Sequence, residues 1–210
     1  MADMRIYGRH GGVNEFDAIG IDASTNSLNV IDYAHHEIHS GSSYHVGYSV
    51  TTASSDNDVT AIAFKTPNTA KWLHIVATFT CSDPAEAIIL EGALTIADRG
   101  DGADKAVLNR NRNVTTPSAV LSWEDTPTAG SVTTMNETEW TAVGISGGTE
   151  LEHVWLQGGS GPHAVGGEAR GSQEWILKPN TDYVFYLTNT GASANAHSIS
   201  LDWYEHTDIR

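Results

Sequence analysis

The densest group of chemically capable side chains lies in the segment from Ile31 to Gly41, where three histidines fall within five residues beside a carboxylate. In a strand, His35, Glu37 and His39 would share one face, and together they could ligate zinc. Same-face neighbours on one strand converge poorly on a tetrahedral ion, because zinc ligands normally come from a helix or from separate elements. We therefore predict an amphipathic strand whose imidazoles form hydrogen bonds, and no metal site at this segment.

A second candidate for cation binding is the acidic, glycine-containing segment from Asp98 to Asp104. Asp98, Asp101 and Asp104 could bring carboxylate oxygens around calcium on a bent loop. The segment is not an EF-hand, because no Glu stands at the twelfth loop position and the flanks are typical of strands. A solvated acidic turn is the simpler interpretation, so these three residues remain weak metal candidates.

Hydrolytic chemistry has little support in the sequence. Cys81 has no identifiable partner for nucleophilic catalysis, and the carboxylates Glu137 and Glu139 lie in a Thr-rich stretch that is typical of a solvated turn. No catalytic residue and no cofactor is predicted, and we do not expect an enzyme.

Six tryptophans could stack on sugar rings if several were exposed on one face. Most of them fall within strand patterns, so packing in the core is the preferred interpretation. The six are Trp72, Trp123, Trp140, Trp155, Trp175 and Trp203.

Composition narrows the classes of partner. The formal net charge is −15, with 26 acidic residues against 11 Lys and Arg, which disfavours binding to nucleic acid. The longest apolar runs are too short to span a bilayer. One cysteine and a start without an apolar leader favour synthesis in a reducing host cytoplasm.

Short segments rich in Val, Ile, Thr and aromatic residues alternate along the chain with clusters of Gly, Ser, Asn and Asp. This pattern predicts an all-β protein. About ten such segments indicate a β-sandwich, which we expect to be of jelly-roll type. The predicted strands are Leu28–Ala34, Ser43–Thr51, Thr60–Lys65, Trp72–Thr80, Ala87–Ile96, Ala119–Trp123, Leu151–Leu156, Glu174–Leu177, Tyr183–Thr188 and Ser198–Tyr204.

Within this domain, residues 28–210, alternation predicts which faces are buried. Ile199, Leu201 and Trp203 should face the core, as should the alternate residues Leu73 to Phe79. The turn signal Lys178–Thr181 predicts a hairpin between the strands on either side of it. Residues 1–27 show no sustained pattern and are expected to form an N-terminal arm or edge segment, and residues 158–171 a long glycine-rich loop.

The sequence also resembles a family, the small β-rich structural proteins of the virions of tailed bacterial and archaeal viruses. The resemblance spans roughly residues 28–207 and rests on the order of five stretches: Ile31–Gly41, Thr66–His74, Asn109–Asn113, Trp175–Tyr183 and Leu201–His206. It implies a non-enzymatic head or decoration protein, and it carries no catalytic residue to this chain. The chain departs from the family in its acidity and in residues 1–27.

The expected function is therefore that of a cement protein, a homo-oligomer and most simply a trimer, bound to the major capsid protein on the outside of a viral head. No nucleic-acid or membrane partner is expected. The alternatives are a tail, baseplate or connector component, or a carbohydrate-binding receptor module that uses exposed tryptophans.

Overall fold

The computed structural model describes residues 7–9, 16–18, 21–22, 27–28, 33–53, 55–95, 100–158, 167–170 and 174–207. The chain divides into two compact units, Met1–His36 and Glu37–Arg210, whereas the sequence placed a boundary after residue 27. The first unit holds two short antiparallel pairs. These are β1 (Tyr7–Arg9) with β2 (Phe16–Ala18), and β3 (Ile21–Asp22) with β4 (Ser27–Leu28).

The histidine segment is a helix, α1 (Tyr33–Ser40), so the prediction of a strand there is wrong. The helix ends because Gly41 adopts a left-handed backbone with φ of 78°, and the amide of Ser42 donates to the carbonyl of Glu37 at 3.0 Å. Glu37 is buried on this helix, while His36 and His39 are exposed. The sequence carried the stop signal, Ser-Gly after a histidine-containing turn, but the alternation outweighed it in the prediction.

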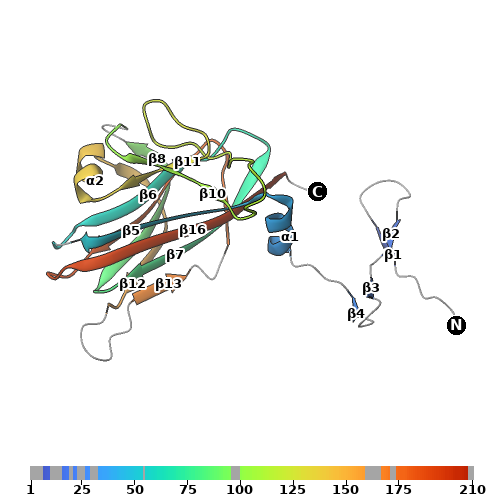
Figure 1. Cartoon of the computed structure of the whole chain (residues 1–210). Coiled ribbons are helices and arrows are strands. Elements are labelled where there is room, and N and C mark those ends of the chain that lie inside the picture. Colours follow the sequence, from blue (N-terminus) through green and yellow to red (C-terminus); the bar gives the residue numbers. More distant parts are fainter. Residues whose placement is uncertain are drawn as a thin grey trace. The chain divides into compact units, whose positions relative to one another are not determined.

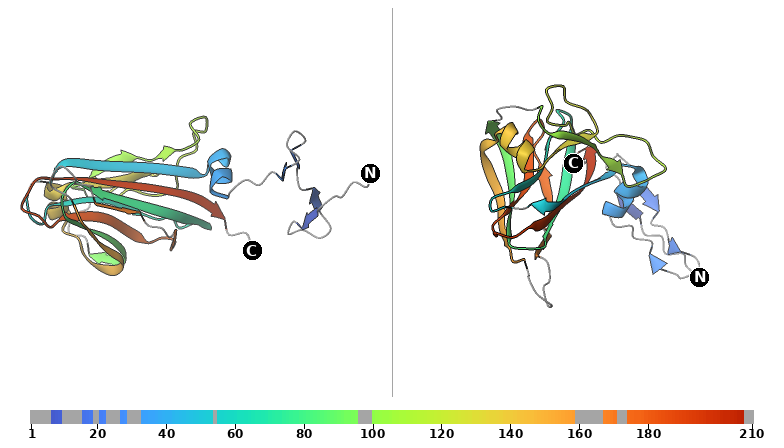
Figure 2. Two further views of the ribbon diagram at one scale, coloured as in Figure 1. Left: turned by 90° about the horizontal axis from the view of Figure 1, so that it is seen from below. Right: turned by 60° about the vertical axis from the view of Figure 1, so that its left-hand side comes forward.

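Strands of the second unit pair as one long hairpin that is rolled into two sheets. The first half of this hairpin, β5 to β8, pairs with the second half, β12 to β16. The pairs are β5 with β16, β6 with β15, β7 with both β13 and β14, and β8 with β12. The result is two antiparallel sheets packed as a sandwich with the strand order of a jelly roll (Figures 1 and 2). The bounds are β5 (Ser43–Ala53), β6 (Val59–Lys65), β7 (Lys71–Cys81), β8 (Ala85–Thr95), β12 (Ser146–Leu156), β13 (Gly167–Arg170), β14 (Trp175–Leu177), β15 (Asp182–Asn189) and β16 (Asn195–Thr207).

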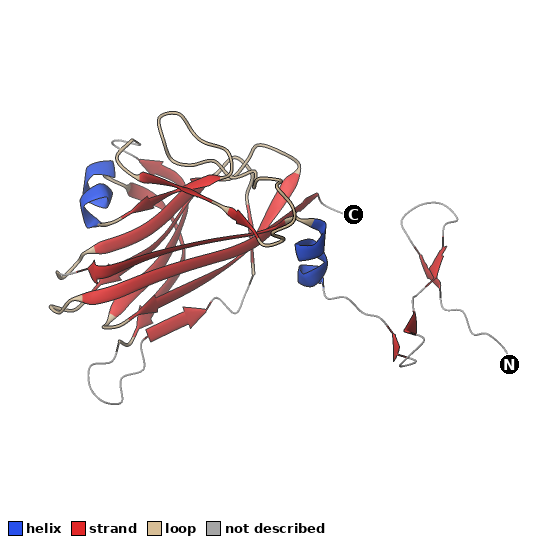
Figure 3. Ribbon diagram, in the orientation of Figure 1, coloured by secondary structure: helices blue, strands red, loops and turns tan. Residues whose placement is uncertain are grey.

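The segment between β8 and β12 adds strands to both sheets beyond β5 and β6. One sheet has the order β10-β5-β16-β7-β13, with β14 also along β7, and the other has the order β12-β8-β15-β6-β11-β9. Strands dominate the described part of the sandwich (Figure 3). The added elements are β9 (Ala103–Ala106), β10 (Leu108–Asn109), β11 (Ser131–Met135) and the helix α2 (Glu137–Val143).

The main core lies between the two sheets and follows the predicted alternation. Ile199, Leu201 and Trp203 on β16 are at most 2% exposed, and Leu73 to Phe79 alternate in the same way on β7. Burial of each large apolar side chain stabilises the fold by about 1.5–3 kcal/mol. A second apolar cluster forms where α2 and Trp123 pack against β6, β11 and β15.

Three local predictions are corrected. The turn at Lys178–Thr181 forms, but it leads from one sheet to the other, so the predicted hairpin between its flanking strands is wrong. Residues 119–123 form no strand but two isolated bridges at Leu121, one to Lys65 and one to Ala129. Glu137 and Glu139 begin α2 rather than a loop, because Asn136 caps the helix and Glu139 completes a capping box.

Candidate functional site

Residues 37–41 of the first resemblance stretch and the other four stretches come together at one end of the sandwich, which we call the proximal end. It comprises residues 37–44, 66–74, 109–119, 174–183 and 201–207. In Figure 1 the last residues of β16 lie beside α1 at this end. The backbone confirms the neighbourhood, since the amide of Glu205 donates to the carbonyl of Ser42 at 2.9 Å.

The asparagines of the run 109–113 attach this loop to the end of α1. Asn109 is buried, and its side-chain amide donates to the carbonyl of Gly41 at 2.7 Å and of Thr116 at 3.1 Å. Asn111 donates to the carbonyl of His39 at 3.1 Å, and its side-chain oxygen accepts from the amide of Asn113. These contacts explain why asparagine recurs, because its side chain can replace a backbone partner in a turn.

Glu205 forms the buried centre of the proximal end. It is 2% exposed, and its carboxylate accepts hydrogen bonds from the Ser118 hydroxyl, the Ala119 amide at 3.0 Å and the Trp203 indole at 3.2 Å. Tyr44 lies in the same core, where burial and then the charge of Glu205 raise its pKa to about 12. Because this carboxylate already accepts three hydrogen bonds from the same chain, we assign it a structural role, in which it joins the segments that carry the donors.

The turn after β14 is fixed to the end of β6. The hydroxyl of Thr66 donates to the carbonyl of Lys178 at 2.6 Å and accepts from the amide of Thr181 at 2.9 Å. Asn180 tolerates the left-handed conformation, with φ of 51°, and its amide donates to the carbonyl of Pro67. The resemblance stretches Thr66–His74 and Trp175–Tyr183 are therefore hydrogen-bonded to each other at this turn.

Two histidines meet on the outer face of the sheet at this end, and sequence reasoning did not single out either of them. His74 on β7 and His206 on β16 place their Nε2 atoms 2.7 Å apart. Tyr204 stacks on His74 with ring centroids 4.7 Å apart, and its hydroxyl lies 3.1 Å from His74 Nδ1. The alternation put both histidines on the outward faces, but only the pairing of β7 with β16 brings them together.

The carbonyl beside His206 fixes the position of one proton in this pair. The carbonyl of Thr207 can only accept, so His206 Nδ1 donates to it at 2.9 Å and leaves Nε2 as an acceptor for His74 Nε2–H. His74 Nδ1 lies 3.1 Å from the Tyr204 hydroxyl and 3.4 Å from Glu174 Oε1, and the carboxylate oxygen can only accept. Burial lowers the pKa of His74, with Glu174 opposing the shift and His206 reinforcing it. The contacts of the pair join the ends of β7 and β16 on this face.

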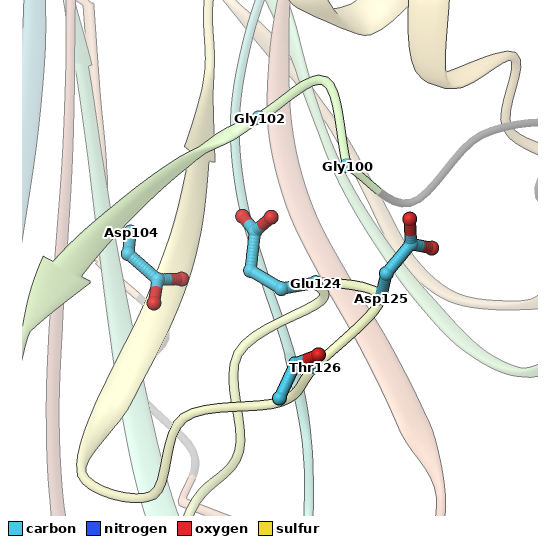
Figure 4. A pocket seen from close by; sticks show the side chains of 6 residues that line it. All are labelled: Gly100, Gly102, Asp104, Glu124, Asp125 and Thr126. Carbon is cyan, nitrogen blue, oxygen red and sulfur yellow. The ribbon is translucent and has the colours of Figure 1, made fainter.

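An acidic pocket of about 510 Å³ lies elsewhere on the sandwich, where β9 meets the loop before β11 (Figure 4). Asp104, Glu124 and Asp125 line it, and Figure 4 shows the carboxylates of Asp104 and Glu124 facing the same space. Burial, followed by the charges of Asp104 and Asp125, raises the pKa of Glu124. Of the weak calcium candidates, Asp104 therefore lines this pocket, Asp101 is an exposed residue, and Asp98 lies outside the described residues.

In the described part of the chain, no three His, Cys, Asp or Glu side chains are grouped closely enough to hold a metal ion. No helix in the same part is long and apolar enough to cross a membrane. The calcium interpretation of Asp98, Asp101 and Asp104 stays a prediction.

The remaining residues with catalytic potential occupy structural positions. Glu137 accepts from the amide of Val59 at 2.7 Å and so fixes the start of β6. Cys81 is buried opposite His197, whose Nδ1 lies 3.2 Å from the Thr60 hydroxyl. Ser146 lies in a Gly-x-Ser-x-Gly spacing, but it begins a strand after a helix, the reverse of the strand–turn–helix order of a nucleophile elbow.

Comparison of the chain with protein families, with curated proteins and with solved structures finds no match. The functional argument therefore rests on the residues and on their arrangement.

Proposed function

We propose that this protein is a non-enzymatic structural protein of a virion, which decorates the outside of a tailed-virus head and stabilises contacts between capsid subunits. The observation that carries the proposal is the convergence of residues 37–41 with the other four resemblance stretches on the proximal end. Their polar atoms are largely occupied by the backbone and side chains of the same chain, as at Asn109, Thr66 and Glu205. Residues used in this way support a rigid scaffold for attachment better than they support a reaction.

The proximal end is also where the sandwich begins after the Met1–His36 unit. The first residues of the sandwich are held by the hydrogen bonds of Gly41 to Asn109 and of Ser42 to Glu205. Such an anchored start suits a domain that is displayed on a separate attachment segment. We propose residues 1–27 as that segment, since an extended chain can add to the edge of a sheet in a neighbouring subunit.

Attachment would gain strength from multivalency. A homotrimer seated at a local threefold position would engage three copies of the major capsid protein at once, so modest contacts per subunit would give tight binding. The formal charge of −15 favours a partner surface that is basic or neutral.

The test is to count the copies of this chain in purified virions by quantitative mass spectrometry and to locate them by cryo-electron microscopy. The major capsid protein serves as the internal standard of known copy number. Hundreds of copies on the head would support the proposal. A small multiple of three or six at one vertex or along the tail would favour a connector, baseplate or tail component, and absence from the particle would refute it.

A further inference from the structure

Trp155 is the most exposed large apolar side chain in the described part of the chain, with 62% of its surface open to solvent. It lies on β12, the outermost strand of its sheet. The imidazole of His153, two residues earlier on the same face, lies almost parallel to the indole, at 15° with centroids 6.1 Å apart. The two rings form a flat aromatic surface.

Carboxylates flank this surface and hold His153 in place. Glu86 on β8 lies directly opposite Trp155, and its Oε2 atom is 3.1 Å from His153 Nε2. Glu150 Oε1 lies 3.5 Å from His153 Nδ1. Since both carboxylates face the same imidazole, their charge is directed at His153, while their remaining oxygen atoms can accept further hydrogen bonds.

On the β15 side this surface ends at Ile88, which is only 6% exposed. His153 lies opposite Ile88, and Ile88 lies opposite Tyr186, whose ring packs against Trp140 of α2 at 4.9 Å. Burial, followed by the charges of Glu150 and Glu86, raises the pKa of Tyr186, which agrees with this neighbourhood. The exposed aromatic surface therefore consists of the Trp155 and His153 rings, whose centroids lie 6.1 Å apart, and it is comparable in breadth to one sugar ring.

We infer that the face formed by Trp155, His153, Glu86 and Glu150 binds a neutral carbohydrate. An exposed indole stacks on the apolar face of a pyranose ring, and flanking carboxylates accept hydrogen bonds from its hydroxyl groups. Sialylated and uronic glycans are disfavoured by Glu86, Glu150 and the net charge of −15. The site is independent of the attachment proposed above, because it needs neither a capsid nor residues 1–27.

The test is an NMR titration of the full-length ¹⁵N-labelled protein with cellotriose, lactose and chitotriose, each up to 10 mM. Two charged matches accompany them, 3′-sialyllactose for lactose and the glucosamine trimer for chitotriose. We expect at least one neutral sugar to shift the Trp155 indole signal and the amides of β12, and sialylation to weaken binding at least threefold.

Two variants complete the experiment. The affinity of each variant is read from the shifts of the β12 amide signals. Trp155→Ala should weaken sugar binding at least tenfold, and Glu86→Gln should weaken it severalfold while keeping the fold. Ile176→Ala removes a comparably exposed apolar side chain from the other sheet and should leave the affinity unchanged. The inference is overturned if no neutral sugar shifts these signals, if the glucosamine trimer binds more tightly than chitotriose, or if Trp155→Ala binds like the wild type.

Discussion

Glu205 shows how a single buried side chain can hold several segments of the chain together. Its carboxylate accepts from Ser118, Ala119 and Trp203, so Glu205→Ala would leave two buried donors, the Ser118 hydroxyl and the Trp203 indole, and the half-buried Ala119 amide without their acceptor. Because each unsatisfied buried group costs about 1–3 kcal/mol, we expect a loss of about 3 kcal/mol in the free energy of unfolding, measured by urea denaturation. Ser118→Ala removes one donor and should cost clearly less. Equal losses for both variants would contradict this account.

His197 makes stability depend on pH at the opposite end of β16. It is 1% exposed, and burial lowers its pKa to about 4, with Asp58 opposing the shift. In the unfolded chain the pKa of His197 has its ordinary value near 6.5, so the unfolded state binds the proton more readily than the folded state. The stability that neutral His197 contributes is therefore complete above pH 6.5 and falls as the pH drops towards 4. The expected loss is about 3 kcal/mol. The lowered pKa of His74 acts in the same direction.

The measurement for His197 is the slope of unfolding free energy against pH between 6.5 and 4. His197→Gln has no charge to acquire, so its slope should be shallower than that of the wild type, whatever its stability at pH 8. Identical slopes for the two proteins would show that His197 does not control this loss.

At the scale of elements, Gly41 decides where α1 ends and β5 begins. Its φ of 78° is unfavourable for any residue with a Cβ atom, and a Cβ placed there would lie 2.7 Å from Val114 Cγ1. Gly41→Ala should therefore destabilise the protein by about 1–2 kcal/mol, measured by chemical denaturation. The double variant with Val114→Ala should recover part of the loss relative to Val114→Ala alone. Strict additivity of the two changes would mean that this contact does not matter.

Sequence patterns predicted the strands better than they predicted the partners of those strands. Period-2 burial on β7 and β16 followed from the alternation of Leu73 to Phe79 and of Ile199 to Trp203, because a sheet with one buried face requires it. The helix α1 was missed because His35, Glu37 and His39 also fit a strand. The pairing of His74 with His206 depends on contacts 132 residues apart, and no local pattern contains that information.

At the scale of the whole molecule, the nested pairing explains why distant stretches meet. A jelly roll brings the first and last strands together, β5 with β16, so residues near 40, 110, 180 and 205 become neighbours at one end. The acidic pocket and the Trp155 face lie on other parts of the same sandwich and use none of these contacts. One sandwich therefore carries the proximal end and, apart from it, these two surfaces.

This separation gives the last prediction, which concerns residues 1–27. The second unit, which contains the sandwich, begins at Glu37, so deletion of residues 1–27 should leave its cooperative unfolding unchanged. The same deletion should abolish binding to viral heads that lack the protein. Binding is measured by co-sedimentation with such heads. A variant with residues 1–27 in scrambled order keeps their length and composition, and it should fail in the same way if their sequence is recognised. Full occupancy by the truncated protein would move the capsid contact onto the sandwich itself.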